Sequence, residues 1–343
     1  MALHQYIQRW LLIGVNLDTG PSPPKPNPPD QLKPLIDALA ATHERFDLMA
    51  VDFGHRYRSA FWTIYLLSAI AVLFAVMPLA LGWDDSRHTM HPLLFLWALG
   101  EVAIILVVGL IYWVGHRRDW QGQWLYARTQ AELTWYLPLI APLVEFAPQA
   151  VKASWYSRAF EAAKPLHADD AIEKLCLEHE PLARECVAGA WEKPDFVRQY
   201  ARWTIEVLEG QRYYHRRVAK RQRAILHRVH SLNNKLFGIT AVTSVVHLSV
   251  HSRWLSVITT FFPALGASLH GALAQSEAYR FAVTAERLVV ELSGAIKSIE
   301  ATQAGGGGGV GDVRDATREA IGVILEEHQD WHMLVRPHHL PLG

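Results

Sequence analysis

The sequence predicts an all-α polytopic membrane protein with two transmembrane hairpins, about four spans in all, and a cytoplasmic helical bundle or stalk. Two observations predict the first hairpin. Residues 59–83 contain no Asp, Glu, Lys, Arg or His, and residues 92–115 form a second apolar run in which Glu101 is the only ionisable acid. A helix needs about 20 apolar residues to cross the ~30 Å hydrocarbon core. The third observation is another apolar block, residues 236–275.

The overall composition conceals this pattern. The 343 residues carry 33 basic and 33 acidic side chains, so the formal net charge is zero. The apolar residues are nevertheless gathered in blocks, which leaves one modest helical region outside the membrane. Only two cysteines are present, Cys176 and Cys186, so a disulfide framework is excluded and a reducing compartment is expected. No cleavable signal peptide is recognisable at the N-terminus.

The N-terminal segment, residues 1–44, is expected to be separate from the membrane unit. Seven prolines lie between positions 21 and 34. Such density favours an extended polyproline spacer, which would hold residues 1–20 away from the spans.

Basic residues set the orientation of the first hairpin. Arg56 and Arg58 precede the first run, Arg117 and Arg118 follow the second, and the loop between them has one arginine and two aspartates. The positive-inside rule therefore places the N-terminus and the chain after residue 115 in the cytoplasm. Tryptophans near the ends of the runs are expected to act as interfacial anchors; these are Trp62, Trp83, Trp113 and Trp120.

The second block is interpreted as another hairpin, with residues 236–250 and 254–274 as its arms. A buried or re-entrant pair is the alternative, because the first arm is short and contains His247. Residues 211–235, which lead into it, contain eight Lys or Arg and no acid. This is typical of a cytoplasmic segment beside an anionic membrane surface, and it favours spanning.

Two apolar stripes predict an antiparallel stalk. One recurs at helical spacing from Phe196 to Leu232, and the other follows a three-four repeat from Ala278 to Ile299. Because both flank the second hairpin, the stripes should face each other. Beyond them, the glycines at 305–309 indicate a flexible joint, and Asp312 indicates the N-cap of a final helix to about residue 328.

The chain is accordingly divided into five parts. They are an N-terminal segment with a Pro-rich linker (1–44), the first hairpin with a juxtamembrane helix (45–138), a cytoplasmic helical region ending in a basic helix (139–235), the second hairpin with a heptad helix (236–304), and a Gly linker, short helix and tail (305–343).

Three polar residues within the membrane blocks are candidate functional groups. Glu101 lies near the middle of its run, where an ionised carboxylate costs at least ~2.5 kcal/mol, so a partner, water or another subunit should face it. A protonated Glu101 bonded within the hairpin is the alternative. His247 and His270 either line a lumen or serve only packing.

A second set of candidates lies just outside the membrane blocks. Four residues recur every four positions on one helix face after the second run: Trp120, Trp124, Arg128 and Glu132. Seven cations are expected to bind anionic lipid headgroups or another phosphate, for which arginine is suited. They are Arg212, Arg216, Arg217, Lys220, Arg221, Arg223 and Arg228.

No pattern indicates catalysis. The glycine run lacks the strand and the Gly-Lys-Ser/Thr of a phosphate loop, and no nucleophile, dinucleotide or metalloprotease motif is found. Cys176, His179 and Cys186 lack a fourth ligand at a metal-site spacing. We expect no enzyme activity, no cofactor, no bound metal and no specific nucleic acid.

Two groups of residues, one after the first hairpin and one in and after the second, form a recognisable pattern. They are Gly115 to Arg118, Trp120, Trp124, Arg128, Ala131, Glu132, residues 262–267, Gly271, Gln275, Glu277, Arg280, Asp330, Trp331, His332, Leu340 and Pro341. This pattern resembles the SMODS- and SLOG-associating two-transmembrane effector (SLATT) superfamily. The chain differs in having two hairpins and no recognisable sensor domain.

The resemblance implies a bacterial inner-membrane effector of anti-phage or conflict systems, permeabilising the membrane when a nucleotide-sensing partner is triggered. The expected partners are the lipid bilayer, further copies of the chain, and a nucleotide-signalling or sensor protein from the same operon. Two other hypotheses remain open: a non-conducting anchor or scaffold that recruits a partner through residues 140–200, and a small transporter using Glu101.

Overall fold

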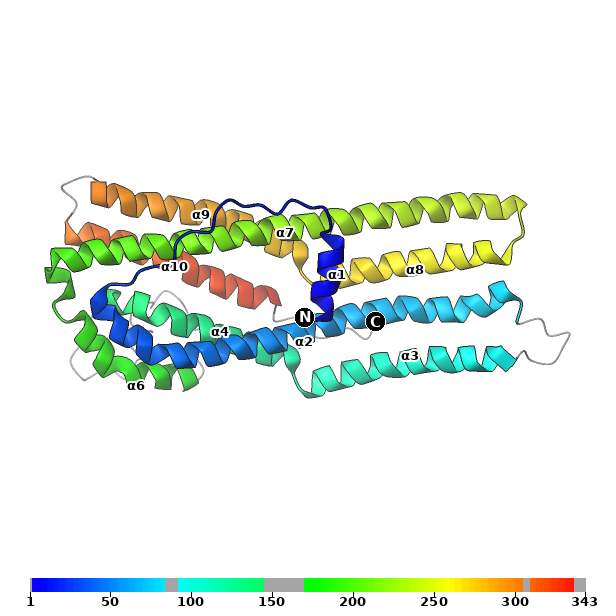
Figure 1. Ribbon diagram of the computed structural model, residues 1–343, viewed down its shortest axis with the longest axis horizontal. Coiled ribbons are helices and arrows are strands. Elements are labelled where there is room, and N and C mark those ends of the chain that lie inside the picture. The colour runs from blue at the N-terminus through cyan, green and yellow to red at the C-terminus, as the bar shows by residue number, and fades with distance from the viewer. Residues whose placement is uncertain (1, 84–91, 145–169, 305–308, 336–343) are drawn as a thin grey trace.

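The computed structural model describes residues 2–83, 92–144, 170–304 and 309–335, and these residues form helices joined by short links, without a strand (Figure 1). The predicted all-α class is confirmed. The loop expected at 84–91, most of the glycine run and residues 336–343 of the predicted tail lie outside the described residues.

Nine α-helices are found in the described residues. They are α1 (Leu3–Leu11), α2 (Lys33–Leu81), α3 (Pro92–Arg117), α4 (Trp120–Ile140), α6 (Asp170–Val187), α7 (Pro194–Ser249), α8 (Arg253–Gln275), α9 (Ala278–Ala304) and α10 (Val310–Val335). Prolines occupy the first turns of α2 and α7, where no backbone donor is lost. Gly82, at φ 70°, ends α2, and the side chain of Asp119 caps α4 by accepting from the backbone nitrogen of Gly122 at 3.1 Å.

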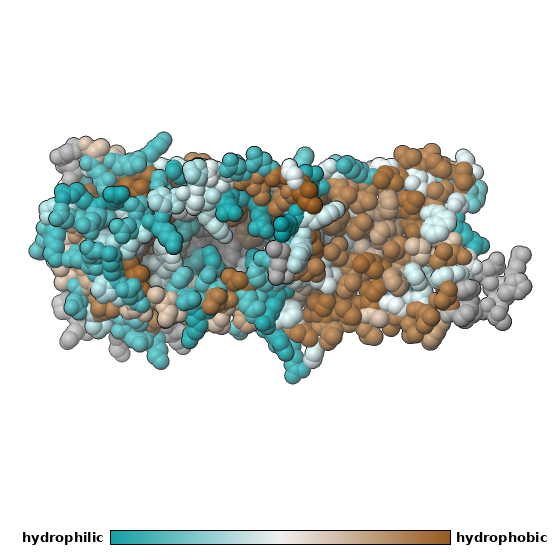
Figure 2. Space-filling model, viewed as in Figure 1, coloured by the Kyte–Doolittle hydropathy of each residue, from teal (hydrophilic) through white to brown (hydrophobic). Residues whose placement is uncertain are grey.

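The helices divide the elongated molecule into an apolar half and a polar half (Figures 1 and 2). The apolar half comprises residues 59–81 of α2 with the two residues after it, α3, residues 236–249 of α7, and α8. The main contacts in this half join α3 to α2, α2 to α8, and α8 to α7. The four segments thus form a row in the order α3, α2, α8, α7.

Three helical stretches of the described residues are long and apolar enough to cross a membrane: Asp30–Leu81, Leu93–Arg117 and Arg253–Ala304. The fourth predicted span, at the end of α7, is not among them and stays a prediction. A physical reason is its length, because an apolar segment of 14 residues (236–249) rises only about 21 Å in a helix, less than the ~30 Å hydrocarbon core.

The polar half is a bundle built around one large core. Buried side chains from α2, α4, α6, α7, α9 and α10 form it, and Cys176 and Cys186 are buried there and form no disulfide with each other. At its centre the hydroxyl of Tyr200 donates to the backbone oxygen of Leu139 at 2.6 Å, joining α7 to α4. A second cluster, around Trp62 and Ile64, continues the core to the boundary between the halves.

The predicted packing of the two stripes is confirmed, because α7 and α9 lie against each other along the polar half. Leu288, Leu292 and Ile299 are all buried on α9, and Phe196 and Val229 on α7. One tryptophan expected at a membrane interface is a core residue instead: Trp62 is only 1% exposed, because its face of α2 packs within the second cluster.

The expected separation of residues 1–20 from the membrane unit is wrong. Helix α1 lies across α2 and α7 at the boundary between the two halves (Figure 1). Its inner face buries His4 and Leu11. The Pro-rich segment therefore returns the chain to the bundle, and α2 begins at Lys33. The domain boundaries expected after residues 44 and 235 consequently fall inside the unbroken helices α2 and α7.

The outer face of α1 is apolar. Four large side chains at helical spacing are exposed along α1 and just beyond it: Leu3, Tyr6, Trp10 and Ile13. Because α1 lies where the apolar surface gives way to the polar one, this stripe has the character of an interfacial helix (Figures 1 and 2).

Candidate functional site

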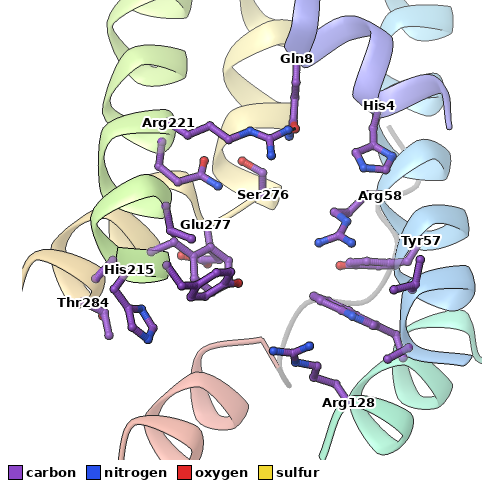
Figure 3. A pocket seen from close by; sticks show the side chains of 18 of the residues that line it. His4, Gln8, Tyr57, Arg58, Arg128, His215, Arg221, Ser276, Glu277 and Thr284 are labelled. Carbon is purple, nitrogen blue, oxygen red and sulfur yellow. Dashed lines mark hydrogen bonds between the residues drawn. The ribbon is translucent and has the colours of Figure 1, made fainter. Parts of the chain in front are cut away.

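A cavity of about 400 Å³ lies at the boundary of the two halves, and we call it the junction cavity. Side chains of α1, α2, α4, α7 and α9 line it, together with the turn between α8 and α9 (Figure 3). That turn contains Glu277, a non-glycine residue at φ 51°. The local backbone thus redirects the chain at the cavity wall.

Helix α1 covers one side of the junction cavity. The side chain of His4 lies 3.2 Å from Ser59 Oγ, and Gln5 Nε2 lies 3.4 Å from His55 Nε2. Burial, with the nearby Arg58, His55 and Arg221 charges, lowers the pKa of His4 to about 3. His4 is therefore neutral at physiological pH, as an imidazole beside guanidinium groups should be.

Arg58 extends from the opposite wall, one helical turn above Gly54. Its Nε donates to the backbone oxygen of Gly54 at 3.0 Å, and its guanidinium carbon is 5.1 Å from the centre of the Trp124 ring. The ring of Tyr57 stacks on Trp124 at 5.8 Å, and the Tyr57 hydroxyl accepts from Gln275 at 2.9 Å. These contacts fix the direction of Arg58, whose guanidinium points into the cavity (Figure 3).

Arg128 enters the cavity from α4. It pairs with Glu132 one turn along, as the four-residue spacing predicted, and lies 3.6 Å from Asp47. Burial alone would lower the pKa of Arg128, but Glu132, Tyr214, Tyr136 and Asp47 together outweigh burial and raise it. Trp124 also lines the cavity, whereas Trp120 packs against the second core cluster.

The predicted basic run of α7 is distributed around the helix instead of forming one surface. Only Arg221 lines the junction cavity, where it donates to Gln8 of α1. Lys220 and Arg228 donate to backbone oxygens of Asp18 and Ile13, so they hold the N-terminal segment.

The remaining four cations of the run point elsewhere. Arg223 pairs with Glu286 of α9, its two nitrogens lying 2.8 and 2.7 Å from the carboxylate oxygens. Arg212 lies 3.5 Å from Glu209, Arg217 lies over the ring of Tyr213, and Arg216 is exposed. The spacing of 100° per residue in a helix accounts for this spread.

The three polar residues of the apolar half are not brought together. Glu101 is partly exposed on α3. His270 is exposed near the junction, with its ring 6.2 Å from that of His230, whereas His247 lies toward the far end of α7.

The charges of the junction cavity do not balance. Three guanidinium groups line it, from Arg58, Arg128 and Arg221, against the carboxylates Glu132 and Glu277. Glu132 pairs with Arg128, and Glu277 lies 3.4 Å from Arg280. Among the described residues, no carboxylate forms an ion pair with Arg58 or Arg221.

Sequence reasoning found Trp124, Arg128, Glu132 and Arg221 but missed the groups that complete the cavity. In the sequence analysis Arg58 served only to predict the orientation of the first hairpin, and His4 and Gln8 lay in a segment expected to be held away from the spans. One signal for α1 was present: Ile7 and Leu11 lie four residues apart, as on the buried side of a helix.

No family model, curated protein or solved structure matches the chain.

Proposed function

We propose that this protein is a membrane effector whose apolar half assembles with further copies of the chain to permeabilise the bacterial inner membrane, on a signal received by a cytoplasmic polar half. The support for the cytoplasmic placement is the charge pattern: Arg56, Arg58, Arg117 and Arg118 flank the first hairpin at the polar end.

The observation that carries the proposal is the row arrangement of the apolar half. In a row, α3 has its main contact with α2 alone, so most of its circumference is uncovered. None of the most apolar window of α3 is buried, and Phe95 and Leu106 are more than 60% exposed. A single row encloses no path for ions. Several rows side by side can enclose one, and uncovered helix faces are the surfaces on which copies would meet.

Glu101 gives this assembly its polar element. It lies in the middle of α3, on the helix that a single chain covers least. A carboxylate at this depth is stable only with water or a polar partner. Contact between copies would supply a polar partner, and a water-filled path between copies would supply water. The SLATT-like residues around Trp124 and Arg128 favour the same class of function, in defence against phage.

Membrane potential in living cells tests the proposal. The chain is expressed from a regulated promoter with its neighbouring genes, and cells carrying a potential-sensitive dye are challenged with phage. We expect triggered depolarisation with the native chain, altered ion selectivity with Glu101→Gln, and no leak with Glu101→Leu, because leucine removes both the charge and the hydrogen-bonding capacity.

Val102→Leu is the matched control, since Val102 is a neighbouring exposed residue of the same helix. It should leave depolarisation unchanged, and all variants should be present in the membrane at equal amounts. Cells that keep their potential when triggered, or a Glu101→Leu variant that leaks like the native chain, would refute the permeabilising role and favour a membrane anchor for a partner.

A further inference from the structure

We propose that the junction cavity is a binding site for a phosphate monoester, held between Arg58 and Arg221 and covered by α1. This deepens the proposed function, because it names the chemistry of the signal, but the binding itself does not depend on permeabilisation. The proposal rests on the geometry and on the unbalanced charge of the cavity walls.

The first argument is the charge left over in the cavity. Arg128 is neutralised by Glu132 and Asp47, whereas neither Arg58 nor Arg221 pairs with a carboxylate of the described residues. Two guanidinium groups directed into one cavity without an anion are electrostatically unfavourable. Burial and the neighbouring arginines lower the pKa of Arg58 to about 10, and burial and Arg217 lower that of Arg221. A bound anion would reverse this cost.

The second argument is the match of charge and shape. A phosphate monoester carries about −1.5 to −2 charges at pH 7, which corresponds to two guanidinium groups, whereas a carboxylate carries one. Guanidinium groups bind phosphate oxygens through two parallel hydrogen bonds. The cavity volume of about 400 Å³ lies in the range of small-molecule sites, and Tyr57 and Trp124 provide an aromatic wall beside Arg58.

The third argument is the cover. His4 and Gln8 of α1 line the cavity, and Gln8 accepts a hydrogen bond from Arg221 (Figure 3). The guanidinium of Arg221 thus donates to an uncharged amide oxygen, and a charged phosphate oxygen would accept a stronger hydrogen bond from it. Helix α1 is joined to α2 by the 21-residue segment 12–32, so it has the chain length to move aside when the ligand enters.

Two sources can deliver this group, because the cavity lies at the boundary of the apolar half. One is a soluble nucleoside or sugar monophosphate. The other is the headgroup of a phosphatidic-acid-like lipid. Both present the same dianion to Arg58 and Arg221.

The experiment is isothermal titration calorimetry on the full chain, purified and delipidated in a neutral detergent. One arm uses adenosine monophosphate, with adenosine as the probe that lacks phosphate. The other uses dioctanoyl phosphatidic acid, with dioctanoyl glycerol as its phosphate-free counterpart. Saturable binding of either phosphate probe, without binding of its counterpart, is expected. The arm that binds identifies the source.

Variants locate the site. Arg58→Gln and Arg221→Gln should each weaken binding about tenfold or more, as expected for the loss of a hydrogen bond to a charged group. Arg216→Gln is the matched control, since Arg216 is an exposed arginine of the same helix that does not line the cavity. Its affinity should stay within about twofold of the native value.

Two results would overturn the proposal. One is the absence of saturable binding in both arms. The other is an equal loss in the Arg216 and Arg221 variants, which would indicate diffuse attraction to a basic surface. Arg221 as a whole residue is exposed, although it also lines the cavity, so its replacement should fold normally even if Arg58→Gln does not. Because binding is measured without any membrane potential, a binding chain that never depolarises cells would refute only the permeabilising role.

Discussion

At the residue scale, His4 makes the position of α1 sensitive to pH. In the docked helix the His4 ring faces Arg58 and His55 of α2 and Arg221 of α7, and its pKa is lowered from 6.5 to about 3. If α1 leaves, the pKa returns toward 6.5. Below pH 6.5 the released state therefore takes up a proton that the docked state does not, and docking weakens by about tenfold per pH unit down to about pH 3.

We predict that α1 is docked at pH 7.5 and that its docking constant is about tenfold lower at pH 5.5. The docked fraction can be measured from electron-spin distances between labels at positions 9 and 279, both exposed. The pKa of His55 is also lowered, by burial and by Arg58.

The His4→Gln variant should lose most of this dependence, since glutamine does not titrate. His251→Gln, at the exposed link between α7 and α8, should retain it. A docked fraction in the native chain that does not change between pH 7.5 and 5.5 would contradict the role given to His4.

At the element scale, two glycines of α3 differ in what they contact. A Cβ at Gly100 would lie 2.6 Å from Phe74 of α2, at a place where Trp97 also donates to the Phe74 backbone oxygen at 2.6 Å. A Cβ at Gly109 would meet nothing within 4 Å. The first glycine permits the close approach of α3 and α2, and the second does not serve this contact.

We predict that Gly100→Ala lowers the thermal midpoint of the chain in detergent and that Gly109→Ala leaves it unchanged or raises it. The first must displace the ring of Phe74, whereas the second only gains the helix propensity of alanine, up to about 1 kcal/mol in an exposed helix. Differential scanning fluorimetry of both variants is sufficient. Equal midpoints for the two would show that Gly100 is not needed for the contact.

The packing of α7 against α9 was predictable because the three-four spacing of apolar residues is visible within the sequence of each helix alone. Val207 and Leu288 illustrate this, since each is buried at a position that its own stripe assigns. The junction cavity was not predictable in the same way. It depends on Arg58, Arg221 and α1 meeting from distant parts of the chain, and no local period encodes which face of one helix meets another.

Composition misled the sequence reasoning about the N-terminal segment. Proline density reports local stiffness but not the direction in which the segment returns, and here Lys220 and Arg228 hold it against α7. In the apolar half, the hydropathy of α3 was sufficient to predict a helix able to cross a membrane. The apolar end of α7 is short, so its hydropathy does not show whether it crosses.

At the scale of the whole molecule, the topology can be tested with single cysteines. His251 lies at the far end of the apolar half and Arg223 lies on the polar side of the junction. With a membrane-impermeant maleimide, we predict that His251→Cys is labelled in intact cells and Arg223→Cys only after permeabilisation.

The native Cys176 and Cys186 are buried, so the background should be low. If position 251 is labelled only after permeabilisation, α7 and α8 do not cross the bilayer, and the second hairpin is a re-entrant or buried pair.

Helices α2 and α7 run without interruption from the polar half into the apolar half, over 49 and 56 residues. At 1.5 Å per residue they are rods of about 74 and 84 Å. From Arg221 to the end of α7 is a lever arm of about 42 Å, by the same rise per residue. A tilt of about 5° at the junction would displace its tip by roughly 4 Å, most of a helix pitch. Small changes beside Arg221 are thereby magnified mechanically at the far end of the apolar half.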